Sequence, residues 1–510
     1  MAVRTSAASR DIVMVASEVV PFAKTGGLAD VTGALPIELA RLGHRVRIAL
    51  PRYGAIDGAA HGLTPWTSVR VPSAGGPISA TIEHATLRDA SIPKDCPIDV
   101  YAIRYDPYFG RAGLYQENGK DYPDNLERFA FFCRATVELL RHLIQDGQRI
   151  DVLHAHDWQT CLAPIYLRTL YDGIETRKIG VLLTIHNLGY QGLFPANQFP
   201  KTELPHALFA PSVLEFHGSV NLLKGGIVYA DLINTVSPTY AREIQSPELG
   251  FGLDGVIAKR QDRLVGVVNG IDVAVWNPAD DPYLSARYSI DDLTGKRACK
   301  AAVQGEYGLP ARDVPVLGLI SRLADQKGID LFLNVLPELL TLDLQTIVLG
   351  TGDPSTEDAF RTLARRFPDK LGVRIGFDEG LAHRIEAGAD LFVMPSRYEP
   401  CGLSQLYSLR YGTIPVVRRT GGLTDTVVPY SPANIKGGKA TGFRFGEAAG
   451  EDLLSTILLA LNVYRDPEQW KAMMLAAMRT DVSWARSARA YQDLYERLAE
   501  IRKKESASSV

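Results

Sequence analysis

The chain has 510 residues, 46% of them hydrophobic and 22% charged, which is typical of a globular enzyme with two or three domains. Its formal net charge is −3, so there is no electrostatic case for nucleic acid or an anionic membrane as a partner. No uninterrupted run of about 18 apolar residues occurs, which argues against a membrane-spanning helix.

The N-terminus and the cysteines indicate a cellular compartment. The opening residues are too few and too polar for a secretory signal or a plastid transit peptide, which favours a bacterial chain. An odd number of scattered cysteines without a C-x-x-C pair predicts free thiols in a reduced cytoplasm. These cysteines are Cys96, Cys133, Cys161, Cys299 and Cys401.

The chain begins with a predicted strand–helix–strand unit. Residues 11–17 and 45–50 are apolar enough for buried strands, and the loop between them carries Lys24, Gly26 and Gly27. A glycine pair at a helix start lets an anion approach backbone N–H groups, and the lysine adds positive charge. The dinucleotide pattern G-x-G-x-x-G is absent. On local pattern alone, ligand binding and a simple tight turn are equally supported.

Further polar loops follow predicted strands in the first half. Residues 51–124 are rich in turns and include an aromatic cluster with Tyr108, for which loop packing is the first explanation and sugar stacking the second. The segment His154-Ala155-His156-Asp157 resembles a metal motif, but no third ligand has suitable spacing and neither H-E-x-x-H nor D-x-D occurs. A metal-free site is therefore expected. Asp157 also fits a helix N-cap.

His186 follows a predicted strand over residues 180–185 and opens a glycine-rich loop. A lone histidine is more often structural, but ligand sites gather at the carboxyl ends of strands in open parallel sheets. Another strand, residues 264–268, leads into Asn269 in the same manner.

The second half repeats this architecture. A strand over residues 316–320 precedes a loop with Arg322 and Lys327, which are spaced to hold a diphosphate, although a solvated surface pair is the alternative. A strand over residues 390–395 precedes Glu399, and helical spacing then continues to Gly412. The next strand, residues 414–417, leads into the glycine pair Gly421-Gly422.

Several motifs occur in a fixed order between about Ile12 and Leu498. They are KTGGL, HAHDW, HNLGYQG, VNGID, SRL-x-x-QKG, EPCGL and RRTGGL-x-DTV. Together they resemble the family of bacterial glycogen synthases and plant starch synthases. The wider group has a second glutamate eight residues after the first, where this chain has Tyr407, so that residue's ribose-binding role is not carried over.

The resemblance implies an α/β fold of the GT-B type, in which two facing Rossmann-like doubly wound domains have the active site in the cleft between them. The expected N-terminal domain is 1–266, on the glucan acceptor side, and the C-terminal domain is 267–480, on the nucleotide-sugar side. Residues 481–510 would contain a helix, about 484–501, that crosses back to the first domain, followed by a disordered tail.

The resemblance also implies roles for individual residues. The catalytic set would be His186, Glu399, Arg322, Lys327 and Asp157. ADP-glucose would be bound by Lys24, Gly26, Gly27, Asn269, Arg322, Lys327, Phe377, Cys401, Gly402, Leu403, Gly421 and Gly422. The sugar and acceptor pocket would include Glu18, Asp30, Tyr108, Asp157 and His186.

The implied reaction transfers glucose from ADP-glucose to the non-reducing end of an α-1,4-glucan such as glycogen. The anomeric configuration is retained and ADP is released, with no metal or other cofactor; the question of a glycosyl-enzyme intermediate stays open, as does that of a homo-oligomer. The alternatives are a UDP-glucose-dependent enzyme of the same fold and a non-catalytic glucan-binding protein. An NAD-dependent dehydrogenase and a phosphorylase with pyridoxal phosphate are more distant alternatives.

Overall fold

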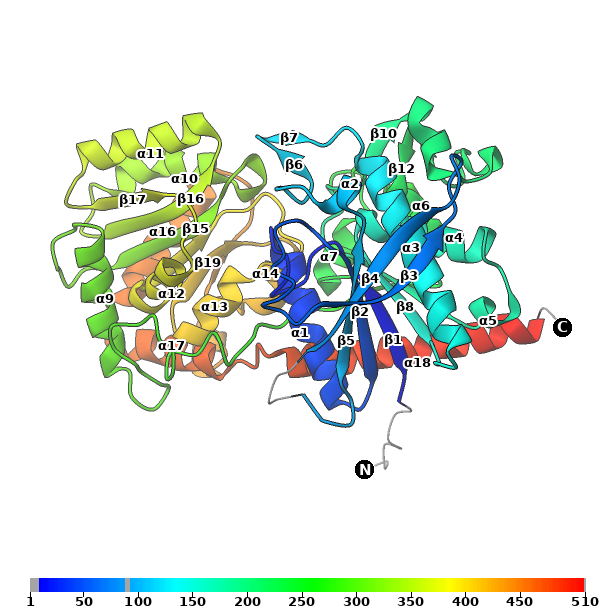
Figure 1. Ribbon diagram of the computed structural model, residues 1–510. Helices are drawn as coiled ribbons and strands as arrows, with labels where there is room; N and C mark the ends of the chain where they lie inside the picture. Colours follow the sequence, from blue (N-terminus) through cyan, green and yellow to red (C-terminus); the bar gives the residue numbers. More distant parts are fainter. Residues whose placement is uncertain (1–8, 88–91, 509–510) are drawn as a thin grey trace. The chain divides into compact units, whose positions relative to one another are not determined.

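The computed structural model describes residues 9–87 and 92–508, which form two compact units (Figure 1). The first unit comprises the described part of Met1–Val236, together with Ala241–Val267 and Trp484–Val510, and the second comprises Ser237–Tyr240 and Val268–Ser483. Within the described residues, no helix is both long and apolar enough to cross a membrane.

The first unit is built on a sheet whose strand order is β14-β13-β9-β8-β1-β2-β5-β4-β3. The strands from β14 to β5 are parallel, whereas β4 and β3 are antiparallel to their neighbours. The strands are β1 (Asp11–Val15), β2 (Arg45–Pro51), β3 (Thr64–Val71), β4 (Ile78–Leu87), β5 (Ile98–Arg104), β8 (Val152–His156), β9 (Gly180–Ile185), β13 (Leu232–Thr235) and β14 (Leu264–Gly266). Because β1 pairs with β2 on one side and β8 on the other, the crevice of a doubly wound sheet opens where β1 and β8 end.

Four helices of this unit, α1 (Gly27–Arg41), α3 (Asn125–Gln145), α4 (Leu162–Thr169) and α18 (Trp484–Ser508), contact strands of the sheet, and the others lie around them. The others are α2 (Asp106–Phe109), α5 (Ile174–Arg177), α6 (Leu222–Tyr229) and α8 (Asp254–Ala258), with α7 (Pro238–Glu243) at the division between units. The 3₁₀ turns are η1 (Trp158–Thr160), η2 (Ala196–Thr202), η3 (His206–Leu208) and η4 (Gln261–Arg263). Short strands complete it: β6 (Gln116–Glu117), β7 (Lys120–Asp121), β10 (Leu193–Pro195), β11 (Glu215–Phe216) and β12 (Ser219–Asn221).

The segment 51–124 is more regular than its many turn residues suggest. It contains β3, β4 and β5, which extend the sheet at one edge. In β3 only two of eight residues are buried, so the strand lacks the apolar alternation by which a half-buried strand is recognised in a sequence.

The last helix, α18, packs against α1 (Figure 1) and against β9 of the first unit. Its buried face contributes Tyr491, Tyr495 and Leu498 to the same cluster as Ile12 and Met14. It does not end at about residue 501 as expected but continues to Ser508, so residues 503–508 are helical rather than a disordered tail. Ion pairs of Arg502 with Glu505 (2.7 Å) and with Asp231 (3.2 Å) hold this extension in place. Residues 509–510 lie outside the described residues.

The second unit has a parallel sheet with the strand order β17-β16-β15-β18-β19-β20. The strands are β15 (Val316–Leu323), β16 (Gln345–Gly352), β17 (Leu371–Ile375), β18 (Leu391–Met394), β19 (Ile414–Arg418) and β20 (Phe443–Phe445). The helices are α9 (Thr294–Glu306), α10 (Ile329–Leu339), α11 (Pro354–Arg366), α12 (Glu379–Gly388), α13 (Ser404–Tyr411), α14 (Gly421–Thr426), α15 (Pro432–Lys436), α16 (Gly450–Tyr464) and α17 (Pro467–Arg479), with the turn η5 (Asp325–Lys327). The strand order reverses beside β15, so the crevice here opens where β15 and β18 end.

Strand β15 is three residues longer than the sequence indicated. Ser321, Arg322 and Leu323 continue the pairing with β16, so Arg322 lies at the end of a strand and not in a loop. The partner residues Gly350 and Gly352 permit this close approach. A Cβ atom on Gly350 would lie 2.2 Å from Ser321 O, and a Cβ atom on Gly352 would lie 2.3 Å from Leu323 O.

Candidate active site

In the first unit, the carboxylate of Glu18 organises the loop before α1. It accepts hydrogen bonds from the backbone N–H of Thr25 (2.5 Å) and Gly26 (3.1 Å), and from the hydroxyls of Thr25 (2.7 Å) and Tyr115 (2.7 Å). Glu18 is buried. In this geometry it supports the glycine loop, and Tyr115, which no sequence motif marked, supports Glu18.

The loop that Glu18 holds presents Lys24 and two exposed glycines at the start of α1. No atom lies within 4 Å of where a Cβ of Gly26 would be, so the space beside this backbone is open. Lys24 Nζ lies 2.6 Å from Asp30 Oδ1 at the surface. An anion at this helix start would compete with Asp30 for the lysine.

Asp157 and His186 are brought together at the ends of the neighbouring strands β8 and β9. Asp157 Oδ1 accepts a hydrogen bond from the backbone N–H of His186 at 2.7 Å. Its backbone has φ of 56°, an uncommon conformation for a residue with a side chain. Although Asp157 stands at the N-cap position of η1, its side chain makes no capping bond. Its carboxylate therefore links two strand ends.

Burial determines the protonation of this part of the site. It raises the pKa of Asp157 to about 7, against the backbone hydrogen bonds from His186 and Asn187. It lowers the pKa of His186 to about 3 and holds the pKa values of His154 and His156 well below the usual range. His186 Nε2 lies 3.0 Å from His156 Nδ1, so one neutral imidazole donates to the other. The His186 ring is thus held neutral.

The paired histidines do not make a metal site in the described residues, where no group of three or more His, Cys, Asp or Glu side chains is arranged to hold a metal ion. His154 instead hydrogen-bonds to Tyr495 (2.9 Å) and Thr184 (2.6 Å). Tyr108 packs against Tyr105 and Phe131, with ring centroids 5.1 and 5.5 Å apart, as a loop-packing residue would.

In the second unit, Lys327 and Glu399 meet where β15 and β18 end. Lys327 Nζ lies 2.6 Å from Glu399 Oε2, which also accepts a hydrogen bond from Ser396 Oγ at 2.9 Å. Gly328 brings the two loops together, because a Cβ atom there would lie 2.1 Å from Pro395 O. Arg322 contacts Gln326 Oε1 at 3.3 Å.

The glycine pair after β19 packs on the loop that carries Glu399. A Cβ atom would lie 1.9 Å from Glu399 O at Gly421 and 2.2 Å from Cys401 O at Gly422. Gly422 N donates to Glu399 O (3.1 Å) and Pro400 O (3.2 Å). Because this N–H already has acceptors, the glycines serve first to permit close backbone packing, a reason different from the expected anion contact.

The other residues that are expected to bind the nucleotide sugar differ in their exposure to solvent. Phe377, which follows β17, is 83% exposed and free to stack on a planar ring. Asn269 is buried and its side-chain Oδ1 has no hydrogen-bond partner in the described residues, while its backbone hydrogen-bonds to the Cys401 thiol. Burial raises the pKa of that thiol to about 12. Gly402, with φ of 75°, leads the chain past Leu403 into α13.

Two family models match the chain in succession. Residues 11–259 match the starch synthase catalytic domain, and residues 308–472 match glycosyl transferases group 1. The fold and both matches define a glycosyltransferase of the GT-B type.

Comparison with known proteins identifies the family within this class of glycosyltransferases. A glycogen synthase of Anaeromyxobacter sp. (strain Fw109-5) is 50% identical, over 96% of this chain and 99% of that protein. One of Thioalkalivibrio sulfidiphilus is 46% identical over the same shares. The catalytic domain of starch synthase IV from Arabidopsis thaliana, solved with ADP and acarbose, superposes with a TM-score of 0.87 at 33% identity, covering 97% of this chain and all of that one. The chain belongs to the glycogen and starch synthase family.

The neutral state of His186 can be tested through stability. Its pKa is lower in the folded chain, about 3, than in the unfolded chain, so acidification below about pH 6.5 places a proton on the unfolded state first. Between pH 7 and pH 5, the wild type should lose about 2 kcal/mol more unfolding free energy than His186→Gln. Denaturant titrations at both values measure this. The exposed His206→Gln variant should keep the wild-type slope, and equal slopes for His186→Gln and wild type would contradict a neutral His186.

Proposed function

We propose that this enzyme is a glycogen synthase that transfers glucose from ADP-glucose to the non-reducing end of an α-1,4-glucan, with retention of configuration and release of ADP. The identity of about half of all residues to a glycogen synthase supports the reaction. The ADP in the related starch synthase supports the donor. The single observation that carries the proposal is the Lys327–Glu399 pair at the crevice of the second unit.

The chemistry requires a site for the departing diphosphate. When the bond from the glucose C1 atom breaks, negative charge grows on the phosphate oxygens, and fixed cations there lower the barrier. Arg322, at the end of β15, and Lys327, in the turn η5 that follows, would take this role. Glu399 keeps Lys327 in place through Oε2, and Oε1, which has no hydrogen bond within the described residues, accepts a glucosyl hydroxyl.

The first unit supplies groups for the sugar. Asp157 accepts a hydroxyl hydrogen bond, and His186 offers a neutral imidazole beside the reacting carbon. A neutral ring can hydrogen-bond there without adding positive charge next to a carbon that itself becomes electron-poor. Lys24 and the start of α1 add a further site for the phosphate or glucosyl group. The reaction would need the sites of both units.

The first experiment is a nucleotide-release assay with glycogen as primer and with ADP-glucose and UDP-glucose supplied separately. The expected result is rapid release of ADP together with elongation of the glucan. Release of UDP alone would overturn the donor assignment while keeping the glucosyltransferase. If folded protein binds glycogen but releases neither nucleotide, the proposed reaction is wrong and a glucan-binding role replaces it.

We also propose that the reaction needs neither a metal ion nor another cofactor and takes place in the cytoplasm. Neutralisation of the diphosphate by Arg322 and Lys327 makes a divalent cation unnecessary. Excess EDTA should therefore leave the ADP release rate unchanged. A rate that falls with EDTA and returns with Mg²⁺ would disprove this. The five cysteines, all unpaired, suit a reducing compartment.

Lys327→Ala should lower kcat about 10²–10³-fold, because one preorganised positive charge at the leaving group is lost. Steady-state ADP release measures the effect, and circular dichroism confirms folding. The surface variant Lys471→Ala, in the same unit, should retain wild-type kinetics. A folded Lys327→Ala enzyme with unchanged kcat would remove Lys327 from the mechanism.

A further inference from the structure

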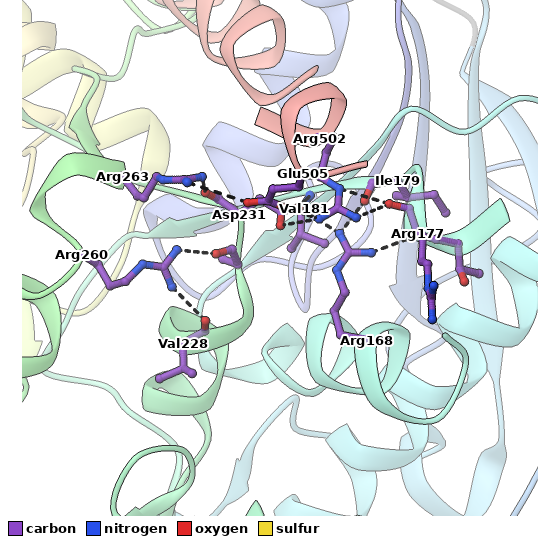
Figure 2. A network of polar contacts seen from close by, with 12 residues as sticks. Arg168, Arg177, Ile179, Val181, Val228, Asp231, Arg260, Arg263, Arg502 and Glu505 are labelled. Atoms are coloured by element: carbon purple, nitrogen blue, oxygen red, sulfur yellow. Dashed lines mark hydrogen bonds and ion pairs between the residues drawn. The ribbon is translucent and has the colours of Figure 1, made fainter. Parts of the chain in front are cut away.

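The first unit has a pocket that is lined by none of the candidate active-site residues. Its volume is about 500 Å³, within the range of small-molecule sites. Four arginines line it, and we call it the arginine pocket. Figure 2 shows most of its charged lining residues, which are Arg168, Arg260, Arg263, Arg502, Asp231, Asp262 and Glu505.

The arginine pocket lies at the amino ends of the strands of the sheet, whereas the candidate active site lies at their carboxyl ends. Asp231 precedes β13, and its carboxylate accepts a hydrogen bond at 2.8 Å from the N–H of Val181, near the start of β9. His186 follows the other end of β9. A six-residue strand spans roughly 20 Å, so a ligand in this pocket would not reach the reacting sugar.

Asp231 is shared by two of the arginines. Arg168 Nη2 lies 2.9 Å from one carboxylate oxygen and Arg502 Nη1 lies 3.2 Å from the other. Arg168 also donates to Ile179 O (2.6 Å), and Arg502 to Arg177 O (3.1 Å). These bonds fix both guanidinium groups in the wall (Figure 2). The single negative charge of Asp231 is therefore shared between two positively charged groups.

Arg260 has no carboxylate partner among the described residues. Its guanidinium donates to the carbonyls of Ile227 (2.8 Å), Val228 (2.8 Å) and Ala230 (2.6 Å), at the C-terminal end of α6. The partial negative charge at a helix C-terminus balances only part of the positive charge of a cation. Burial lowers the pKa of this arginine, and its neighbour Arg263 lowers it further.

Arg263 is the most loosely held of the four. It reaches Asp262 at 3.3 Å, Asp231 O at 3.2 Å and Glu505 at 3.8 Å, all longer than a strong charge-assisted bond. Its side chain is 29% exposed. In total, four guanidinium groups face three carboxylates, from Asp231, Asp262 and Glu505, so one positive charge is unbalanced.

We propose that the arginine pocket binds a phosphate monoester of a small molecule, with the phosphate held by Arg263 and Arg260. Guanidinium groups approaching from several directions suit the three oxygens of a phosphate, each able to accept two N–H groups. Because Arg260 is already held by three carbonyl groups, little further entropy of its side chain is lost when the anion binds. The remaining volume accommodates the organic part of the ligand.

Such a ligand would contact two of the segments through which the chain passes between the units. Arg263 belongs to η4, from which β14 leads to the point where the chain leaves the unit, and Arg502 lies on α18, with which the chain returns. Binding would therefore stabilise the docking of α18 and raise the melting temperature of the first unit.

Isothermal titration calorimetry with inorganic phosphate and with glycerol 3-phosphate tests the proposal, with glycerol as the uncharged control. Both phosphates should bind, glycerol 3-phosphate more tightly, and glycerol should give no heat beyond dilution. Arg263→Gln should weaken binding at least about tenfold, the loss of one charge-assisted contact. Arg263→Lys should recover part of it. Arg361→Gln, an exposed arginine of the second unit, should bind as wild type does.

Three results would overturn the proposal. The first is no binding of either phosphate, the second is binding that is unchanged in folded Arg263→Gln, and the third concerns the donor site. If Lys327→Ala, rather than Arg263→Gln, abolishes the heat, the phosphate occupies the donor site and the arginine pocket is purely structural. Binding of inorganic phosphate without any gain from glycerol 3-phosphate would limit the site to a free anion.

Discussion

Parallel strand pairing around the first strand of each sheet is the constraint on which the two candidate sites depend. β1 pairs with β2 and β8, and β15 pairs with β16 and β18, so the strand order reverses beside each first strand. The loops on either side of that reversal must diverge, and they leave a crevice. Side chains that are far apart in the sequence are thereby placed together at the carboxyl ends of the strands of one sheet.

Within those crevices, the protein controls charge by two different means. In the second unit a buried carboxylate, Glu399, is balanced by Lys327 and by a hydroxyl. In the first unit, burial keeps His186 and its neighbours uncharged. On the proposed function, Lys327 stands where the diphosphate leaves, and the neutral hydrogen-bonding groups stand where the sugar reacts. Each arrangement follows from the local environment of the side chain.

Polar groups gather at both ends of the strands in the first sheet, but the two groups differ in kind. At the carboxyl ends of its strands, loops rich in glycine leave backbone exposed and open space beside Gly26. At the amino ends, arginines from α4, from η4 and the turn before it, and from α18 converge on Asp231 and on carbonyl oxygens. The helix α18, which begins where the chain returns to this unit, contributes Arg502 to this group of arginines.

Most strands, the glycine loops and the residues after them can be predicted from the sequence, because they depend on local periodicity and on short motifs such as that around Glu399. What those residues contact is visible only in the folded chain. Glu18 holds a loop with help from Tyr115, the Gly422 N–H is already bonded, and α18 continues to Ser508. The arginine pocket likewise brings together segments hundreds of residues apart. Such contacts form only when the chain folds, since no local pattern encodes which distant group will satisfy a buried charge.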